Sequence, residues 1–438
     1  MNASFGPGSA PLSGEVHVPG DKSMSHRAVL FSAMAEGTTL LKGVLESADV
    51  RATIGAVINL GARAELEAQA DGSLAGTVRG WGTSCPLPLR DTIDCGNSGT
   101  TSRLLMGVLA GWPAEVTLVG DESLSRRPMR RVTDPLTTMG ARYTLTDAGT
   151  LPVVIHGRAS IRPMTYRSPV ASAQVKTAVL LAGLRAPGRT SVTEPSLSRD
   201  HTERMLPIFG VPVHVDSTTR SASVDGPITP KAPAEFVVPR DPSSAAFLTI
   251  AALLIPGSKV TMPGVSLNPT RSGFLRVVER MGSGLEVAPW PESQGERVGS
   301  IIACTAESLS ATTVTAEEIP SLIDEVPILA LLATQVAGET RFEGVGELRV
   351  KESDRLAAVI DGLTALGADA RAEGDTLIVT GPTPLHGATL PSLGDHRLAM
   401  TWAVAGLIAS APVIVEGFEA IDVSYPGFAR DLKGLATA

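Results

Sequence analysis

The sequence predicts an α/β fold with two similar domains, each made of three repeated units. Three observations support this prediction. A polar cluster followed by an apolar helical run recurs six times, an amphipathic helix separates the copies, and 438 residues suffice for two domains. Successive copies begin roughly 70–85 residues apart, which is long enough for one supersecondary unit each. Repeats of this kind indicate architecture more often than chemistry.

The six apolar helices each follow a cluster rich in Gly, Ser or Asp. The copies are GDKSMSHRAVLFSAMAEG from Gly20, DCGNSGTTSRLLMGVLAG from Asp94, SPVASAQVKTAVLLAGL from Ser168, RDPSSAAFLTIAALLIPG from Arg240, LIDEVPILALLATQVAG from Leu322 and GDHRLAMTWAVAGLIAS from Gly394. Because these runs are apolar on nearly all sides, we expect buried helices. The clusters can satisfy the first backbone N–H groups as caps, or present those groups to an anion.

A second helix in each unit is amphipathic and ends, in five of the six, in a bulky residue followed by glycine. These helices are expected in residues 49–62, 127–141, 198–211, 270–282 and 352–368, with a degenerate sixth in residues 425–435. The closing glycines are Gly61, Gly140, Gly210, Gly282 and Gly367, and each suits a left-handed helix C-cap. Pro128 fits the first position of the second of these helices. Strand-like segments such as residues 144–157 and 370–381 follow the helices.

The repeats also predict the domain boundaries. Residues 20–239 hold the first three copies and form an N-terminal domain. Residues 240–438 hold the other three and form a C-terminal domain, which the N-terminal strand within residues 1–19 joins.

Composition excludes several classes of protein. The formal net charge of −8 and the pI near 5.5 argue against nucleic acid as a partner. Three cysteines without paired or metal-ligand spacing favour reduced thiols and a cytoplasmic location. The chain start lacks the pattern of a secretory signal, and no apolar run is long enough to span a membrane.

Cations gather at or near the expected helix starts. They are Lys22, Arg27, Arg103, Arg126, Arg127, Lys351, Arg355 and Arg397. A cation at a helix N-terminus opposes the helix dipole, so a repeated arrangement of this kind favours an anion bound between the cations. The alternative is a set of solvated surface cations, or cations paired with Asp21, Asp354 and Asp395.

Carboxylates accompany these cations in the second half of the chain. Asp324 and Glu325 precede the fifth apolar helix, and Glu352 and Asp354 lie beside Lys351. Carboxylates in such surroundings can transfer protons, because burial and neighbouring charges shift their pKa. Asp324 and Glu352 can also be helix caps, which is the commoner role at these positions and is compatible with proton transfer.

Seven phrases follow one another along almost the whole chain. They are PGDKSMSHRA from Pro19, CGNSGTTSRLL from Cys95, RRPM from Arg126, SAQVKTAVLLAGL from Ser172, SRDHTERML from Ser198, LRVKESDRL from Leu348 and GDHRLAM from Gly394. In this order they resemble the 5-enolpyruvylshikimate-3-phosphate (EPSP) synthase family, the 3-phosphoshikimate 1-carboxyvinyltransferases. The resemblance implies two domains of three βαβαββ units each, an inside-out α/β barrel whose helix N-termini face the interdomain cleft.

The resemblance also implies an activity. Phosphoenolpyruvate would donate its enolpyruvyl group to the 5-hydroxyl of shikimate 3-phosphate, releasing phosphate, in the biosynthesis of chorismate and the aromatic amino acids. This reaction requires no metal or redox cofactor. It requires neutralised anions, a positioned hydroxyl and proton transfer, and guanidinium groups suit carboxylate and phosphate. The implied partners are these two small molecules, with no nucleic acid and no membrane, and the implied state is a monomer.

The site residues follow from the same resemblance. The catalytic candidates are Lys22, Asp324 and Glu352. Shikimate 3-phosphate is assigned to Lys22, Ser23, Arg27, Ser172, Ala173, Gln174, Ser198, Asp324 and Lys351. Phosphoenolpyruvate is assigned to Lys22, Asn97, Gly99, Arg127, Gln174, Arg355 and Arg397. The fourth cluster, with Asp241 and Ser243, receives no ligand contact, and we expect it only to cap its helix and to serve the hinge between the domains.

Three positions depart from the family pattern. Ala173 replaces a frequent second serine of the phosphate loop, Glu347 replaces an asparagine, and Val423 replaces a lysine near the last turn. Gly99 leaves space where a methyl group would intrude, and we therefore expect competitive inhibition by glyphosate.

Two other functions stay open at this point. A sister family transfers enolpyruvyl to UDP-N-acetylglucosamine, but it pairs the first lysine with asparagine and carries a reactive cysteine where this chain has Glu122. A non-catalytic two-domain anion-binding protein would keep the cations, but it has no need for Lys22, Asp324 and Glu352 together.

Overall fold

The computed structural model describes residues 1–8, 10–86, 88–282 and 284–437. It divides into two compact units. The N-terminal unit comprises Gly20–Val238 together with Ser293–Glu296. The C-terminal unit comprises Met1–Pro19, Pro239–Glu292 and Arg297–Ala438.

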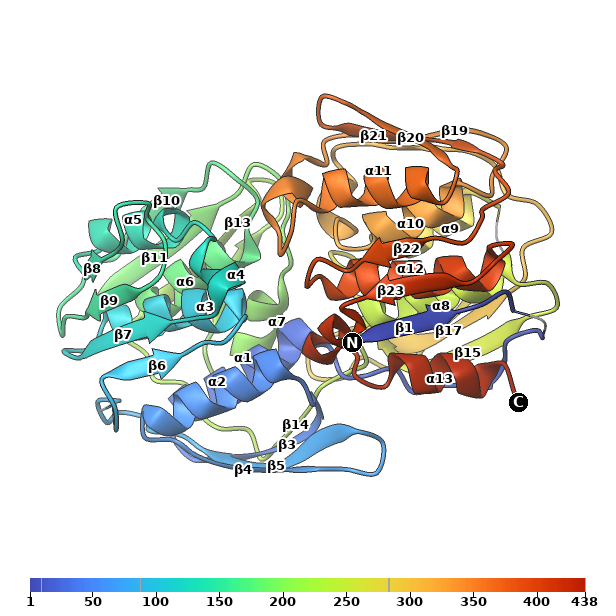
Figure 1. Ribbon diagram of the computed structural model, residues 1–438. Coiled ribbons are helices and arrows are strands. Elements are labelled where there is room, and N and C mark those ends of the chain that lie inside the picture. The colour runs from blue at the N-terminus through green and yellow to red at the C-terminus, as the bar shows by residue number, and fades with distance from the viewer. Residues whose placement is uncertain (9, 87, 283, 438) are drawn as a thin grey trace. The chain divides into compact units, whose positions relative to one another are not determined.

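Three four-stranded sheets surround three buried helices in the N-terminal unit (Figure 1). The buried helices are α1 (Lys22–Met34), α3 (Gly99–Ala110) and α6 (Ala173–Gly183). The sheets have the orders β14 (Glu235–Val237), β3 (Thr38–Leu45), β5 (Ser73–Arg79), β4 (Arg63–Ala68); β6 (Thr92–Asp94), β7 (Glu115–Val119), β9 (Val153–His156), β8 (Arg142–Thr144); and β10 (Thr165–Arg167), β11 (Gly188–Thr193), β13 (Ser221–Gly226), β12 (Val213–Asp216). The remaining helices are α2 (Ala48–Asn59), α4 (Glu122–Ser125), α5 (Arg130–Thr138) and α7 (His201–Ile208).

The C-terminal unit repeats this plan. Its buried helices are α8 (Pro242–Leu254), α10 (Val326–Ala333) and α12 (His396–Ile408). Its sheets have the orders β16 (Leu285–Pro289), β17 (Val298–Cys304), β15 (Lys259–Ser266), β2 (Ser13–Glu15); β18 (Thr313–Val314), β19 (Gly338–Phe342), β21 (Thr376–Gly381), β20 (Asp369–Glu373); and β1 (Asn2–Phe5), β23 (Val413–Glu416), β22 (Thr389–Pro391). The other helices are α9 (Gly273–Arg280), α11 (Arg355–Ala365), α13 (Phe428–Leu435) and the 3-10 turns η1 (Ile319–Ser321), η2 (Gly346–Val350) and η3 (Phe418–Val423).

Each four-stranded sheet contains one parallel pair and two antiparallel pairs. In the second repeat, for example, β6 pairs with β7 in parallel across α3, and β7 and β8 both pair antiparallel with β9. A parallel pair needs a crossover connection, and in this repeat the buried helix α3 supplies it. This is the βαβαββ unit, and the expected two-domain inside-out α/β fold is confirmed.

The polar clusters cap five of the six buried helices. Asp21, Ser98, Ser172, Asp241 and Asp395 each accept a hydrogen bond from a backbone N–H of the first turn. These caps matter because the first N–H groups of a helix have no partner within it, and a buried N–H group without a partner is costly. The sixth helix, α10, begins after Glu325, whose side chain makes no cap hydrogen bond.

The left-handed backbone predicted at the helix ends is confirmed, but one predicted helix start is wrong. All five predicted closing glycines have positive φ, from 71° at Gly210 to 111° at Gly140. The expected start of the helix in residues 127–141 is wrong, because α5 begins at Arg130 and Pro128 lies outside it. The Met129 N–H bonds the Gly149 carbonyl at 2.9 Å.

In the described residues, no helix combines the length and the apolar character needed to cross a membrane.

Replacing the buried cap of α3 tests the role of the polar clusters. The Ser98 hydroxyl is fully buried and accepts from the Thr101 N–H at 3.1 Å. We expect Ser98→Ala to destabilise the protein by about 1–2 kcal/mol, measured as a lower midpoint of urea unfolding. The exposed Ser84→Ala is the control. Equal midpoints for both variants would contradict the capping role.

Candidate active site

Lys22 opens α1 and lies beside a buried carboxylate. Its Nζ is 2.6 Å from Asp49 Oδ2, in the first turn of α2, and the two side chains are 20% and 8% exposed. A lysine at a helix start opposes the helix dipole, and Asp49 compensates for this. The ion pair with Asp49 fixes the position of the Lys22 ammonium group, which the sequence predicts to be catalytic.

Arg127 lies against the start of α3. Its Nη2 donates to Asn97 Oδ1 at 2.7 Å, and Asn97 Nδ2 donates to Asp121 Oδ2 at 2.6 Å. A Cβ added to Gly99, the first residue of α3, would lie 3.3 Å from Arg127 Nη1. The structure therefore brings together Asn97, Gly99 and Arg127, which the sequence assigned to one ligand.

Gln174 connects α6 with α3. Its Oε1 accepts from Arg103 Nη1 at 2.5 Å, and its Nε2 donates to Thr100 Oγ1 at 3.0 Å. Arg103 was recognised as a helix-start cation but was assigned no substrate. Its contact with Gln174 places it beside the predicted site residues.

Arg27 is buried and held by three helices. Its Nε and Nη2 donate to Thr202 Oγ1 and Thr177 Oγ1 at 2.9 and 3.0 Å, and its Nη1 donates to the Ser23 carbonyl at 3.0 Å. The Ser23 hydroxyl accepts from Arg199 Nη1 at 3.2 Å. Arg199 lies in the SRDHTERML phrase, but nothing in the spacing distinguished it as a neighbour of α1.

Ser172 and Ser198 belong to the loops that precede α6 and α7. Ser172 caps α6, with its Oγ accepting from the Val175 N–H at 3.4 Å. Ala173 is the first residue of α6. The Ser198 Oγ is buried, and it has no hydrogen-bond partner among the described residues. A buried hydroxyl without a partner is costly unless a ligand completes it.

His26 lies among these groups as a neutral side chain. Its Nδ1 contacts Thr53 Oγ1 at 2.7 Å, which contacts Thr101 Oγ1 at 2.6 Å. Burial lowers the pKa of His26 well below its usual value, and Lys22 and Arg27 lower it further. The imidazole therefore carries no charge near pH 7 and links α1, α2 and α3.

Arg355 is the centre of the cluster in the C-terminal unit. It is the first residue of α11, and its side chain is 1% exposed. Its Nε, Nη1 and Nη2 donate to Asp395 Oδ2, Asp324 Oδ1 and Glu352 Oε2 at 2.8, 3.1 and 2.6 Å. Burial alone would lower the pKa of Arg355, but Asp395, Glu352 and Asp324 raise it.

Asp324 faces three cations. Its carboxylate lies 3.4 Å from Lys351 Nζ, 3.1 Å from Arg355 Nη1 and 3.6 Å from Arg397 Nη2. The capping alternative is wrong for Asp324 and Glu352, because Glu325 occupies the cap position of α10 and Asp354 caps α11. Both carboxylates instead contact the cations with which the sequence grouped them.

The fourth polar cluster contributes more than a helix cap. Asp241 caps α8, as expected, but Ser243 hydrogen-bonds the Glu325 carboxylate, which also accepts from Arg397 at 3.4 Å. Arg271 donates to Asp241 and Ser243 at 3.0 and 2.7 Å. The expectation of capping alone is therefore incomplete.

Glu325 is one of the buried carboxylates of this group. Burial raises its pKa, and Arg397 and Arg271 partly oppose the rise. A raised pKa favours the protonated form of a carboxyl group. The sequence placed Glu325 at the start of α10 but assigned it no role.

The structure also places two of the three departures from the family pattern. Glu347 lies exposed in η2, and Val423 ends η3. Ala173, Glu347 and Val423 lack the hydroxyl, amide and ammonium groups of the family pattern, so we expect other groups of the chain to bind the substrates in their place.

Among the described residues no group of three or more His, Cys, Asp or Glu side chains is placed to hold a metal ion.

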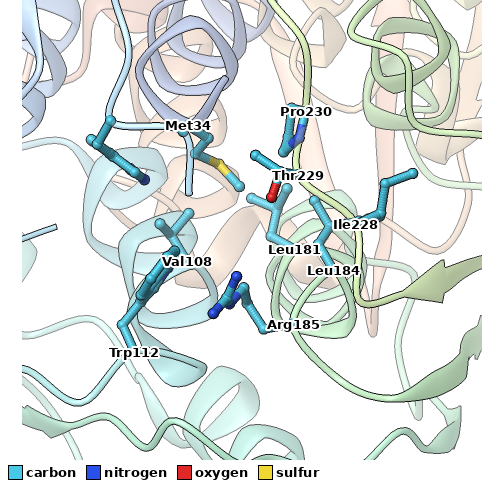
Figure 2. Close-up of a pocket in the computed structure, with 11 residues that line it drawn as sticks. Met34, Val108, Trp112, Leu181, Leu184, Arg185, Ile228, Thr229 and Pro230 are labelled. Atoms are coloured by element: carbon cyan, nitrogen blue, oxygen red, sulfur yellow. The ribbon is translucent and has the colours of Figure 1, made fainter. Parts of the chain in front are cut away.

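One pocket of the N-terminal unit lies away from these residues (Figure 2). It encloses about 300 Å³ of empty space, part of it open solvent, and Met34, Val108 and Leu181 line it near the C-terminal ends of α1, α3 and α6. Lys22, Gly99 and Ala173 are the first residues of the same helices. A helix of 13 residues is about 20 Å long, so the pocket is separate from the predicted site.

Comparison with known proteins assigns the chain to a family. The family model described as EPSP synthase (3-phosphoshikimate 1-carboxyvinyltransferase) matches residues 7–432. The chain belongs to the EPSP synthase family. It is 46% identical to the 3-phosphoshikimate 1-carboxyvinyltransferase of Rhodospirillum rubrum, across 98% of this chain and 95% of the relative. It is 47% identical to that of Halorhodospira halophila, across 99% and 96%.

Solved structures agree with this assignment. The chain resembles the EPSP synthase of Acinetobacter baumannii with a TM-score of 0.86 and 38% identity, over 99% of this chain and 98% of that chain. It resembles the enolpyruvyl transferase NikO of Streptomyces tendae with a TM-score of 0.76 and 19% identity, over 99% and 97%, which shows the shared fold alone. The chain is therefore an enolpyruvyl transferase of the EPSP synthase family, and this assignment displaces the two other functions considered from the sequence.

Removal of the Arg355 charge should destabilise the C-terminal unit strongly. Arg355→Met leaves Asp324, Glu352 and Asp395 without their shared cation, and we expect a loss of about 3–5 kcal/mol. Differential scanning calorimetry measures it as a lower melting temperature. The control is Arg371→Met, which removes a half-exposed arginine paired with Glu339 and should leave the melting temperature near that of the wild type. Equal melting temperatures for the two variants would contradict the central role of Arg355.

Proposed function

We propose the following roles for the site residues in the reaction of the EPSP synthase family. In the N-terminal unit, Ser23 and Arg27 hold the shikimate ring and its carboxylate, and Ser172 and Ser198 bind the 3-phosphate. Gln174 lies beside the ring. The buried Ser198 hydroxyl that lacks a hydrogen-bond partner in the described part of the chain supports the phosphate assignment.

Phosphoenolpyruvate carries a carboxylate and a phosphate, and we assign cations from each unit to them. Lys22 and Arg127, with Asn97 and the backbone at Gly99, are the contribution of the N-terminal unit. Arg355 and Arg397 are the contribution of the C-terminal unit. One observation carries this proposal: Asp324 faces Lys351, Arg355 and Arg397 within 3.1–3.6 Å. Such a group of cations can bind a polyanion, and guanidinium forks match phosphate and carboxylate oxygens.

The chemistry needs both a proton donor and a proton acceptor. In the addition step, the 5-hydroxyl oxygen bonds C2 of phosphoenolpyruvate, its proton passes to a base, and C3 receives a proton. In the elimination step, C3 loses a proton and the C2–O bond to phosphate breaks. Lys22, Asp324 and Glu352 are the groups that we propose for these transfers, because each lies in a charged and partly desolvated network.

We also propose that the protein works in the cytoplasm as a monomer, on these two small molecules. The free cysteines Cys85, Cys95 and Cys304 support a reducing compartment.

Loss of the Lys22 ammonium tests the catalytic assignment. We expect Lys22→Ala to lower kcat by at least about 10²-fold, because general acid–base groups contribute this much. Phosphate release from phosphoenolpyruvate and shikimate 3-phosphate measures it. Lys42→Ala is the control, since Lys42 is an exposed lysine of the same unit that pairs with Glu235. Full activity of a folded Lys22→Ala protein would remove Lys22 from the mechanism.

A methyl group at Gly99 tests the phosphoenolpyruvate assignment. In Gly99→Ala the new Cβ lies 3.3 Å from Arg127 Nη1, so this guanidinium group must move by a few tenths of an ångström, and it contacts Arg103 Nη1 at 3.4 Å. We expect the KM for phosphoenolpyruvate to rise about tenfold, which corresponds to about 1.4 kcal/mol of lost binding. The KM for shikimate 3-phosphate should change little.

Inhibition by glyphosate supplies a second readout for the same variant. The wild-type enzyme should show competitive inhibition against phosphoenolpyruvate, and Gly99→Ala should weaken it. No inhibition of the wild type at glyphosate concentrations well above the KM for phosphoenolpyruvate would overturn the expectation.

A further inference from the structure

A buried group of three charges lies in the third repeat of the N-terminal unit. Lys176 Nζ is 2.7 Å from Glu194 Oε2 and 2.7 Å from Glu203 Oε1. The side chains are 4%, 1% and 7% exposed. Lys176 lies in the first turn of α6, Glu194 directly follows β11, and Glu203 lies in the first turn of α7. Burying three ionisable groups is costly unless each has a partner, as here.

Glu194 also binds the two serine loops through their backbones. Its Oε1 accepts from the Ser172 N–H at 3.0 Å, and its Oε2 accepts from the Ser198 N–H at 3.4 Å. One carboxylate thus joins the segment before α6 to the segment before α7. It restricts the backbone from which both serine hydroxyls project.

The repeats of the same unit show that the fold does not require this lysine. Lys176 is the fourth residue of α6. The fourth residues of α1 and α3 are Ser25 and Ser102, which are buried as well. Two equivalent helices therefore pack with a small serine where α6 carries a buried cation. The lysine serves something that is particular to the third repeat.

We propose that Glu194 is a positioning residue for the 3-phosphate of shikimate 3-phosphate, with Lys176 as its counter-ion. Glu194 holds the Ser172 and Ser198 backbones so that the two side chains meet the phosphate in one arrangement. The inference rests on the proposed assignment of Ser172 and Ser198 to that phosphate. A pre-arranged loop binds with less loss of conformational freedom, which favours affinity.

The charges of Lys176, Glu194 and Glu203 are compatible with a positioning role for Glu194. A lone carboxylate near a phosphate would repel it, and Lys176 offsets the charge of Glu194. Burial raises the pKa of Glu203, and Lys176 opposes the rise.

The test compares two glutamates that share one lysine. Glu194→Gln keeps a single acceptor oxygen, so it loses one of the two backbone bonds. Glu203→Gln is the matched control, since it removes the other carboxylate from Lys176. We expect the KM for shikimate 3-phosphate to rise about tenfold in Glu194→Gln and less than about threefold in Glu203→Gln. In both variants, kcat and the KM for phosphoenolpyruvate at saturating shikimate 3-phosphate should stay within about threefold.

Two further variants test the phosphate assignment and provide for a Glu194→Gln protein that does not fold. Ser198→Ala tests the phosphate assignment itself, and it should raise the KM for shikimate 3-phosphate. If Glu194→Gln does not fold, the triple variant Lys176→Met, Glu194→Gln and Glu203→Gln leaves no unpaired charge in this group and must show the same rise.

The possible failures are distinguishable. If Ser198→Ala raises this KM while Glu194→Gln leaves it within twofold of the wild type, the positioning role is overturned and the phosphate assignment stands. If Ser198→Ala leaves it unchanged, the phosphate assignment fails and the inference fails with it. Equal changes in both KM values for both glutamine variants would show a structural role only, and would also overturn the proposal.

Discussion

The structure depends on satisfying the backbone N–H groups at the starts of buried apolar helices. Six such helices fill the interiors of the two units, and the N–H groups of their first turns have no partner within the helix. Short polar residues at the cap positions solve this problem for five of them. The polar clusters are therefore a requirement of the fold before they are a feature of the site. Because they also present oriented donors, the same positions can bind anionic substrates.

The two units arrange charge around these helix starts in different ways. In the N-terminal unit, hydroxyl and amide groups dominate, and the buried Arg27 bonds two threonines and a backbone carbonyl. In the C-terminal unit, carboxylates dominate, and Arg355 contacts three of them. The second arrangement holds cations and carboxylates together, because each carboxylate stabilises the arginine beside it.

Much of the fold and part of the site could be predicted from patterns local in the chain. The apolar runs located all six buried helices, and the glycines after the amphipathic helices have the left-handed backbone expected of C-caps. The start of α5 was predicted too early, and the hydrogen bond from Met129 to Gly149 beside it joins residues that no local pattern relates. The contact of Ser243 with Glu325 was missed for the same reason, since 82 residues separate them.

The sequence by itself determined the fold class, the repeat and the family, because hydrophobic period, helix caps and ordered motifs are properties of neighbouring residues. Through the family resemblance it also predicted which residues take part in the reaction. Only the tertiary structure decided which charges become partners. Lys22 with Asp49, Arg355 with Asp395, and Glu194 with Lys176 lie on different elements, and their distances depend on how the helices pack. Ion pairing over such separations follows burial and geometry, which no local pattern records.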